Sequence, residues 1–289
     1  MVIPLNEQYT DPRPTVDSES REQKRFEGRI DDLSARALGG ETVFSDFLTP
    51  KEQHALMRYL RERGRQNSVR LWGGFEGAER AVACFLPEYL EELLADSEEE
   101  PEYFGAILSE SLAVLEIRGS GYRTLTHRDF LGAVLGLGVE RDAIGDILIL
   151  PGDGNGREQP RAYLVATEKI APFLLSELKK IGSDTVRVKR GAFPEDFVFA
   201  PKTRPISDTV ASERLDCVIG ALVNTSREKA QALIRAGLVE VDYESAEKVD
   251  ARLAPPSVIS VRGHGKFRLL TLGGTTKKGR IRLTAEQYI

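Results

Sequence analysis

The spacing of hydrophobic positions in residues 212–243 predicts a short helix, a three-residue turn, a second helix and a strand. In the first helix the apolar residues recur at intervals of 3, 4 and 7, the spacing of one buried stripe; they are Leu215, Val218, Ile219 and Leu222. Two helices this short are marginal alone. We therefore expect the pair to dock on the strand that follows.

The second helix of this pair has signals at both ends. Thr225 or Ser226 is its expected N-cap, because a short hydroxyl side chain can accept a hydrogen bond from a free backbone N–H group. Gly237 fits the left-handed residue that ends a helix. The residues expected to face inward are Ala230, Leu233 and Ile234. The outward surface then carries a row of cations that suits phosphates: Arg214, Arg227, Lys229 and Arg235.

The middle third of the chain alternates strands and helices in the order βαββαβ. The predicted strands are 112–117, 146–150, 161–167 and 185–189, and the predicted helices are 127–138, capped by Thr126, and 170–181. This order folds as a four-stranded sheet with two helices on one face. Many RNA-binding modules of this architecture stack bases on aromatic residues of the open face. Tyr163 is the main aromatic candidate here, so the pattern leaves open whether this part contacts RNA.

The remaining segments are shorter. Residues 1–20 are polar and predicted to be loose, residues 97–102 form an acidic linker or loop, and residues 191–210 form a connector. Near the N-terminus we predict helices at 21–38 and 50–63 and strands at 68–72 and 81–86, the strands joined by the glycine-rich turn 73–77. After the helix pair we predict strands at 258–261, 266–272 and 280–283.

The chain is therefore predicted to be an α+β protein of three small domains. They are an N-terminal α/β domain, a ferredoxin- or RRM-like middle domain, and a helical hairpin on a small β-sheet. The boundaries are a flexible N-terminus at 1–24, the first domain at 25–105, the middle domain at 110–192, a linker at 193–208 and the last domain at 209–289.

Charge is distributed unevenly along the 289 residues, although the net charge is only −5. Residues 1–110 hold 13 Lys and Arg against 23 Asp and Glu, whereas residues 202–289 hold 15 against 10. An acidic head with a basic tail indicates that the tail meets a polyanion. The alternative, a basic surface that only aids solubility, stays open.

Other features exclude several classes of protein. No apolar run approaches the ~20 residues that cross a bilayer, and the first residues do not have the pattern of a secretion signal. The two cysteines, Cys84 and Cys217, lack metal-binding spacing and suggest a reducing compartment. We expect a cytoplasmic monomer without a membrane span, a metal site or a cofactor.

Two motifs resemble those of enzymes. His127-Arg128-Asp129 copies the start of a kinase catalytic loop, but Val134 stands where that loop needs Asn, so a capped helix N-terminus is the preferred interpretation. The glycine-rich residues 152–156 follow a strand, but a predicted strand comes next instead of the helix that a phosphate cradle needs. A hairpin loop is favoured there, and no catalytic residue is assigned.

The helix pair resembles the S4 RNA-binding domain. The resemblance rests on Arg214-Leu215-Asp216, on Ser226-Arg227 with Ala230, and on the run from Ile234 through Gly237 and Val239 to Val241. The chain departs from the family pattern after this strand, where Asp242-Tyr243-Glu244 replaces the Asn-Gly of many relatives.

The chain from about residue 25 also resembles the YlmH family of bacterial RNA-binding proteins. The matching segments, in the family's order, are 47–53, 73–80, 127–132, 145–148 and 276–281. The resemblance implies a non-catalytic protein that binds rRNA and tRNA. Its implied partner is the large ribosomal subunit that retains peptidyl-tRNA during ribosome-associated quality control. The family is encoded among cell-division genes.

The predicted RNA-binding residues all lie in the last domain. They are Arg214, Ser226, Arg227, Lys229, Arg235, Arg262, Lys266, Arg268, Lys277, Lys278 and Arg280. His264, in the same basic segment, is either an RNA contact or an exposed turn residue. The alternative function is an RNA-modifying enzyme, similar to a pseudouridine synthase, with an unrecognised catalytic site.

Overall fold

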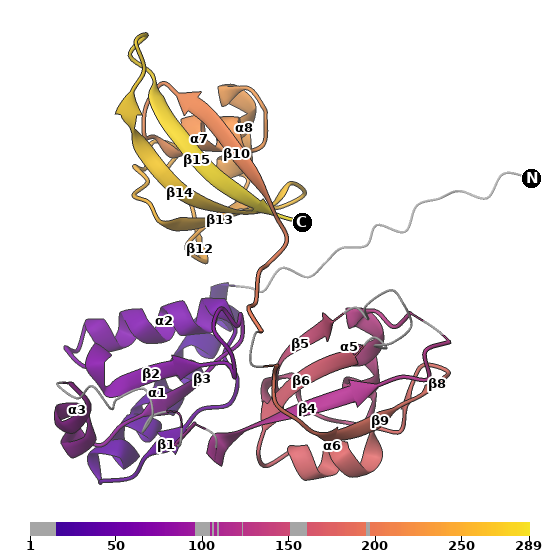
Figure 1. The fold of residues 1–289 in the computed structure, drawn as a ribbon. Helices are drawn as coiled ribbons and strands as arrows, with labels where there is room; N and C mark the ends of the chain where they lie inside the picture. Colours follow the sequence, from indigo (N-terminus) through magenta and orange to yellow (C-terminus); the bar gives the residue numbers. More distant parts are fainter. Residues whose placement is uncertain are drawn as a thin grey trace, which may run out of the picture.

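The computed structural model describes residues 16–95, 105, 107–108, 110–122, 124–150, 161–194 and 197–289. Within them the chain is a mixture of helices and antiparallel sheets, which agrees with the predicted α+β class (Figure 1). None of the helices in these ranges is long and apolar enough to cross a membrane. The predicted acidic loop at 97–102 and the glycine-rich residues 152–156 lie outside the described residues.

The N-terminal sheet has three antiparallel strands, in the order β1-β3-β2. Its elements are α1 (Val16–Leu38), β1 (Val43–Phe44), α2 (Pro50–Arg61), a 3-10 turn (Gln66–Ser68), β2 (Val69–Trp72), β3 (Val82–Phe85) and α3 (Glu88–Ala95). Thr49 and Glu52 form a capping box at the start of α2. The prediction that residues 16–20 are loose is wrong, because the uninterrupted helix α1 already begins there: no proline occurs between Val16 and Leu38.

The middle sheet has four antiparallel strands, in the order β5-β6-β4-β9. Its elements are β4 (Leu112–Arg118), α5 (His127–Gly136), a 3-10 turn (Arg141–Ala143), β5 (Ile144–Leu150), β6 (Arg161–Thr167), α6 (Ala171–Glu177) and β9 (Arg187–Arg190). The predicted βαββαβ order is confirmed. Helix α6 is shorter than predicted, because Leu178 leaves the helical region and a small hairpin follows, with β7 (Lys180–Ile181) paired to β8 (Asp184–Thr185).

Both faces of the middle sheet are covered over much of their area. Helices α5 and α6 pack on one face, where Leu115, Ile117 and Leu164 are buried. On the other face Val165 packs with Phe47 and Phe75 from the N-terminal part. Three further phenylalanines join this layer, Phe193, Phe197 and Phe199; together with Phe75 they are called here the aromatic cover.

The aromatic cover closes over the residue that could have stacked on bases. Tyr163 is 2% exposed, and its ring centroid lies 5.1 Å from that of Phe193. A base has no access to this ring, so an RNA contact through an open aromatic face is excluded for the middle sheet. The sequence did not show this, because the covering rings come from the glycine-rich turn and from the predicted connector.

A buried arginine joins the N-terminal and middle sheets. The Arg80 guanidinium donates hydrogen bonds to the carbonyl oxygens of Phe47 (2.9 Å), Arg141 (3.3 Å) and Ile144 (3.2 Å). The Asp146 carboxylate accepts from the backbone N–H groups of Glu79 (2.6 Å) and Arg80 (3.3 Å). These contacts hold the glycine-rich turn against the start of β5.

The C-terminal sheet has six strands, in the order β10-β15-β14-β13-β11-β12. Its elements are β10 (Thr203–Val210), α7 (Leu215–Leu222), α8 (Arg227–Arg235), β11 (Val239–Val241), β12 (Glu244–Ser245), β13 (Ser257–Val261), β14 (Gly265–Thr275) and β15 (Ile281–Tyr288). The predicted connector is wrong for residues 203–210, which pair with β15 along its whole length. Pro205 is tolerated because β10 is an edge strand, where a missing N–H is not needed.

Helices α7 and α8 pack on this sheet as the hydrophobic spacing predicts. Leu215, Val218 and Ile219 are fully buried, and the Ser226 hydroxyl, not Thr225, caps α8. Gly237 has φ +66°. After β11 the chain turns through Asp242 (φ +48°) and Tyr243 (φ +67°), the two left-handed residues of a type I′ hairpin.

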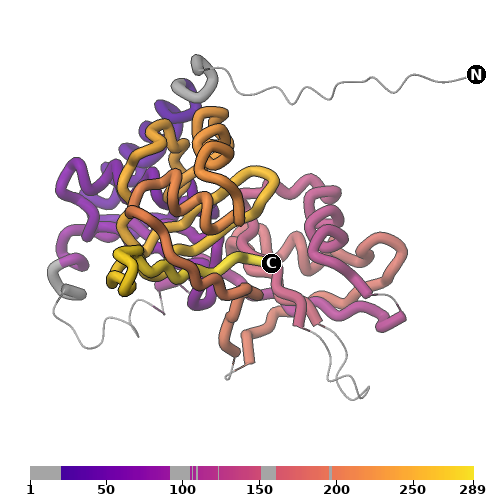
Figure 2. The backbone as a smooth tube through the Cα atoms, turned by 90° about the horizontal axis from the view of Figure 1, so that it is seen from above, coloured from indigo at the N-terminus to yellow at the C-terminus, as the bar shows by residue number. Residues whose placement is uncertain are grey.

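The C-terminal sheet lies over the N-terminal part of the molecule (Figures 1 and 2). Glu244 of β12 pairs with Arg58 of α2, and its carboxylate is 3.8 Å from His54. The Lys266 ammonium is 3.3 Å from Glu79 of the glycine-rich turn. These three contacts do not involve the exposed surface of α8.

Candidate nucleic-acid interface

A buried carboxylate organises the helix pair. Asp216 follows the first residue of α7 and is completely buried. Its oxygens accept hydrogen bonds from Arg214 (3.2 and 3.1 Å), Arg227 (2.9 Å) and Gln231 (2.7 Å). The two guanidinium groups therefore have fixed positions, one at the start of each helix, while remaining 35% and 54% exposed.

The surroundings of Asp216 keep its carboxylate ionised. Burial alone would raise the pKa of this group, but the hydrogen bonds from Arg214, Gln231 and Arg227 outweigh burial and hold the pKa far below its usual value. The same contact raises the pKa of Arg214. Both arginines can still offer N–H groups to a phosphate, because a guanidinium carries five donors.

Helix α8 presents further cations to solvent. Lys229 is exposed, and its backbone N–H donates to the Ser226 hydroxyl (3.3 Å). Ser226 thus acts as a helix cap. Arg235 is exposed in the last turn, with one guanidinium nitrogen 3.5 Å from the Gln231 side-chain oxygen. With Arg227 these residues give α8 a basic outer surface.

The predicted residues around β13 and β14 have different surroundings. Arg262 is exposed, and its backbone N–H donates to the Leu238 carbonyl (2.8 Å), close behind α8. Lys266 is partly buried between Tyr243 and Tyr288 and pairs with Glu79. Arg268 pairs with Glu286 at 2.6 Å. Of these three cations, Arg262 is thus the most available to a phosphate.

The last predicted group lies at the far end of β14. Lys277 and Lys278 are exposed in the turn between β14 and β15. Arg280 donates to the Thr209 hydroxyl (2.8 Å) on β10, shortly before α7 begins. Strand β14 separates this turn from Lys266 by up to ~30 Å, at ~3.4 Å per residue. The predicted residues therefore do not form one cluster, because Lys277 and Lys278 lie beyond one end of β14 and Lys266 lies at the other.

Asp216 and Gln231 are parts of this site that the analysis of the sequence missed. A carboxylate within an otherwise apolar helix was the available signal, since a buried acid must find partners. Asp216 had entered only as part of the Arg214-Leu215-Asp216 motif.

The side chains that an enzyme could use as nucleophile, base or metal ligand have structural surroundings in the described part of the chain. Burial raises the pKa of the Cys84 thiol to about 12, so it is not a thiolate at neutral pH. Asp129 forms a capping box with Thr126, which confirms the helix N-terminus interpretation of residues 127–129. Among the described residues, no group of three or more His, Cys, Asp or Glu side chains could hold a metal ion.

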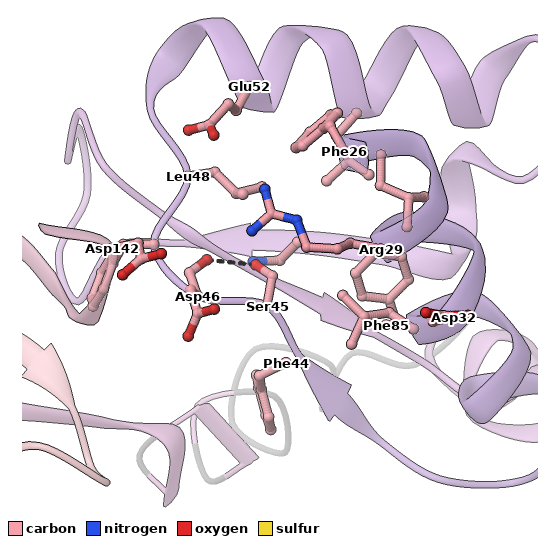
Figure 3. A pocket seen from close by; sticks show the side chains of 15 residues that line it. Phe26, Arg29, Asp32, Phe44, Ser45, Asp46, Leu48, Glu52, Phe85 and Asp142 are labelled. Atoms are coloured by element: carbon pink, nitrogen blue, oxygen red, sulfur yellow. Dashed lines mark hydrogen bonds between the residues drawn. The ribbon is translucent and has the colours of Figure 1, made fainter. Parts of the chain in front are cut away.

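A pocket of about 270 Å³ lies between α1, α2 and the loop before Leu48 (Figure 3). Arg29 reaches into it among carboxylates from separate elements, including Asp46, Glu52 and Asp142. Glu52 is already engaged in the α2 capping box. The pocket therefore presents charge without an evident nucleophile and base.

The family comparison concerns the middle sheet. Residues 111–195 match the family model described as "Putative RNA-binding domain in YlmH". The match covers all four strands of this sheet, both helices and Phe193 of the aromatic cover.

A curated protein and a solved structure match longer stretches of the chain. A curated protein of Bacillus subtilis (strain 168), "Ribosome-associated protein quality control protein P2", is 28% identical over 244 residues, which are 84% of this chain and 86% of that protein. A solved structure, "Cell division protein ylmH from Streptococcus pneumoniae", aligns with 68% of this chain and 100% of its own, with 19% identity and a TM-score of 0.40. The expected resemblance to YlmH-type proteins is confirmed.

Proposed function

We propose that this chain is a non-catalytic RNA-binding protein that acts on the ribosome in the cytoplasm. Its binding partner would be the large subunit that retains peptidyl-tRNA, which it would contact through rRNA and tRNA. The family model supports RNA binding, and the name of the Bacillus subtilis relative supports a place in ribosome-associated quality control.

One observation carries the RNA-binding proposal. The completely buried Asp216 holds Arg214 and Arg227 at the starts of two helices, and Lys229 and Arg235 extend the basic surface along α8. A fixed array of guanidinium groups suits phosphate oxygens, because each planar fork can donate two parallel hydrogen bonds. We propose that residues 203–289 form an S4-type unit that uses this surface.

We further propose that the chain comprises three domains, with the first two acting as one body. Arg80 and the aromatic cover join residues of the N-terminal sheet to the middle sheet over a continuous contact. The acidic head would face solvent or a protein factor, because bare phosphate repels it. Two RNA contacts on one chain would raise avidity only where both RNA surfaces lie within reach.

The test is co-sedimentation of the full chain with three particles at matched, near-physiological salt. The particles are large subunits with peptidyl-tRNA, empty large subunits and complete ribosomes. We expect recovery to be highest with the first, because the retained tRNA adds a second RNA surface and the small subunit covers part of it in the complete ribosome. Equal recovery with all three would leave a general RNA-binding protein.

A matched pair of variants tests the surface. Lys229→Gln with Arg235→Gln should weaken recovery with every particle. Lys202→Gln with Arg204→Gln, which removes the same charge at exposed positions near the start of β10, the end of that strand away from α7, should not. Nucleoside mass analysis of RNA incubated with the protein tests the enzymatic alternative. A modified nucleoside formed by the purified chain would overturn the non-catalytic proposal.

A further inference from the structure

The exposed part of the middle sheet carries arginines on three neighbouring strands. Arg118 of β4 lies directly opposite Arg161 of β6 on one side and opposite Arg187 of β9 on the other. Directly opposite residues of antiparallel strands point to the same face. Ile117, the neighbour of Arg118, is buried on the helix side, so the three arginines belong to the face that α5 and α6 do not cover.

The next row of the same face marks the border of the buried area. It consists of Tyr163, Glu116 and Lys189 on the same three strands. Tyr163 lies beneath the aromatic cover. Glu116 is 5% exposed and accepts hydrogen bonds from Arg118 and from Lys189, the latter at 3.0 Å. This single sheet face is therefore apolar and covered at one end, and basic at the other.

The basic end is accessible. The side chains of Arg118 and Lys189 are 54% and 64% exposed although both contact Glu116, and Arg187 is exposed as well. These residues, with Lys179, line a groove of 540 Å³ between the end of α6 and the edge strand β9. The three arginines with Lys189 are called here the arginine row.

The position of Glu116 fixes two of these cations. Burial alone would raise the pKa of this carboxyl, but its hydrogen bonds with Lys189 and Arg118 outweigh burial and lower it. The carboxylate stays ionised and keeps its two partners at the edge of the aromatic cover. Arg187 is exposed beside them, where a polyanion can reach it.

The groove carries the cations Arg187 and Lys179 beside Arg118 and Lys189, which together share the single carboxylate Glu116. An anion that binds along the groove is attracted by this excess of positive charge, and its binding releases counterions. The groove beside β9 gives a phosphate backbone room to follow the sheet edge. The rings on the sheet face itself are not available to bases, because Tyr163 and the four phenylalanines pack against one another.

We propose that the arginine row is a second RNA site, which binds backbone phosphates and makes no aromatic stacking contact with bases. The proposal rests on the proposed function and deepens it. It supplies the second RNA contact that the avidity argument requires on the same chain. It also assigns RNA binding by the middle sheet to a surface other than the aromatic face that such sheets commonly use.

The experiment uses the full chain with Arg187→Glu and Lys179→Glu. Both side chains line the groove, whereas the buried Glu116 is held by Arg118 and Lys189, which stay unchanged. The matched control is Arg128→Glu with Lys169→Glu, which makes the same change in charge at exposed positions outside the groove. Circular dichroism of both variants confirms that they are folded.

The probe is a fluorescein-labelled RNA hairpin, measured by anisotropy over a salt titration. We expect the groove variant to bind about tenfold more weakly and to have a salt slope lower by about 1 to 2, as for the loss of two phosphate contacts. The control should change affinity less than about twofold. Wild-type affinity and slope in the groove variant would overturn the proposal.

Two comparisons identify the ligand class. The groove variant should lose the same factor of affinity for homopolymeric RNAs of each base, because the row contacts phosphate. A loss of affinity for the RNA of one base alone would contradict this. Polyglutamate should compete poorly with RNA at the row. If it competes equally and the groove variant loses only polyglutamate binding, the row is a protein-docking surface and the proposal is wrong.

The Lys229→Gln, Arg235→Gln variant, measured beside these, separates the two proposals. If it alone loses RNA affinity, the proposed function stands and the arginine row is not an RNA site. If neither variant loses affinity, the proposed function itself fails.

Discussion

The middle and C-terminal sheets both hold cations with a buried carboxylate, but they present these cations on opposite surfaces. Each is antiparallel, carries two helices on one face, and contains a buried carboxylate that holds two cations: Glu116 in one and Asp216 in the other. In the C-terminal unit the carboxylate lies on the helix pair, so the helices present the charge. In the middle unit it lies on the opposite sheet face, at the border of an aromatic layer.

The difference shows that neighbouring segments decide which surface of a fold is available. A four-stranded βαββαβ sheet commonly offers its open face to RNA. Here Phe75 from the preceding sheet and Phe193, Phe197 and Phe199 from the following segment occupy that face. Architecture alone would have assigned the wrong surface.

The largest expected effect comes from removing the centre of the aromatic cover. Phe75→Ala should lower the free energy of unfolding by about 3–5 kcal/mol, because Phe75 is buried against three other rings. Urea denaturation measures the loss. The control is Phe173→Ala on α6, where the ring is 40% exposed and the loss should be under about 1.5 kcal/mol. Equal losses would mean that the cover does not stabilise the sheet.

The next effect concerns the carboxylate in the helix pair. Asp216→Asn should cost about 2–3 kcal/mol, since charge-assisted hydrogen bonds to two arginines are lost. The folded-state pKa of Asp216 is depressed, so its stabilisation is present above the unfolded pKa of about 4 and is lost as pH falls below it. The difference between the free energies of unfolding at pH 7 and at pH 3 should therefore be smaller in Asp216→Asn than in the wild-type chain. Urea denaturation at the two pH values measures it.

Asp208→Asn is the matched control for that experiment. Asp208 is exposed on β10, and its replacement should leave both stability and its pH dependence nearly unchanged. A similar pH dependence in Asp216→Asn and the wild-type chain would show that Asp216 is not the group responsible.

A smaller effect is expected from single cations on α8. Lys229→Gln or Arg235→Gln should each weaken RNA binding about three- to tenfold and lower the salt slope by about 1, without changing stability. Arg227→Glu is a poorer test, because the new carboxylate would face the buried Asp216 and destabilise the helix pair. Anisotropy with Lys202→Gln as control, at an exposed position beside the start of β10, decides whether α8 is the contact surface.

The smallest effect tests the contact between the C-terminal sheet and the rest. Glu79→Gln removes the partner of Lys266, and stability should change by less than about 1 kcal/mol, as for other exposed ion pairs. RNA affinity should rise, by up to about twofold, because the Lys266 ammonium becomes available. Glu76→Gln, also exposed in the same turn, should change neither. A fall in affinity would show that Glu79 supports the RNA-binding conformation.

Local chemistry made much of this fold predictable. The capping boxes at Thr49 and Thr126, the buried stripe of α7 and the left-handed Gly237 depend on residues close in sequence. The strand at 161–167 begins and ends as predicted. These features follow from short-range sterics and hydrogen bonding, which a sequence displays directly.

Pairing over long distances was not predictable. Strand β10 is polar and contains Pro205, so nothing in its own pattern shows that it aligns with β15. The aromatic cover draws rings from residue 75 and from beyond residue 192, and no periodicity links them. The cations of the candidate site were identified from their charge. The role of Asp216, which positions two of them, becomes visible only when α7 and α8 are packed together.

The aromatic cover also has a consequence for synthesis on the ribosome. Phe75 precedes the middle sheet in the chain, but Phe197 and Phe199 leave the ribosome after β6 is already complete. At roughly 5–20 residues per second, synthesis from the end of β6 to Phe199 takes about 2–6 s. The sheet face around Tyr163 lacks its last covering rings for that time. During those seconds the growing chain exposes an apolar surface that chaperones can bind. A fragment cut at residues 111–195 would lack Phe75, Phe197 and Phe199 and so would keep only Phe193 over that surface.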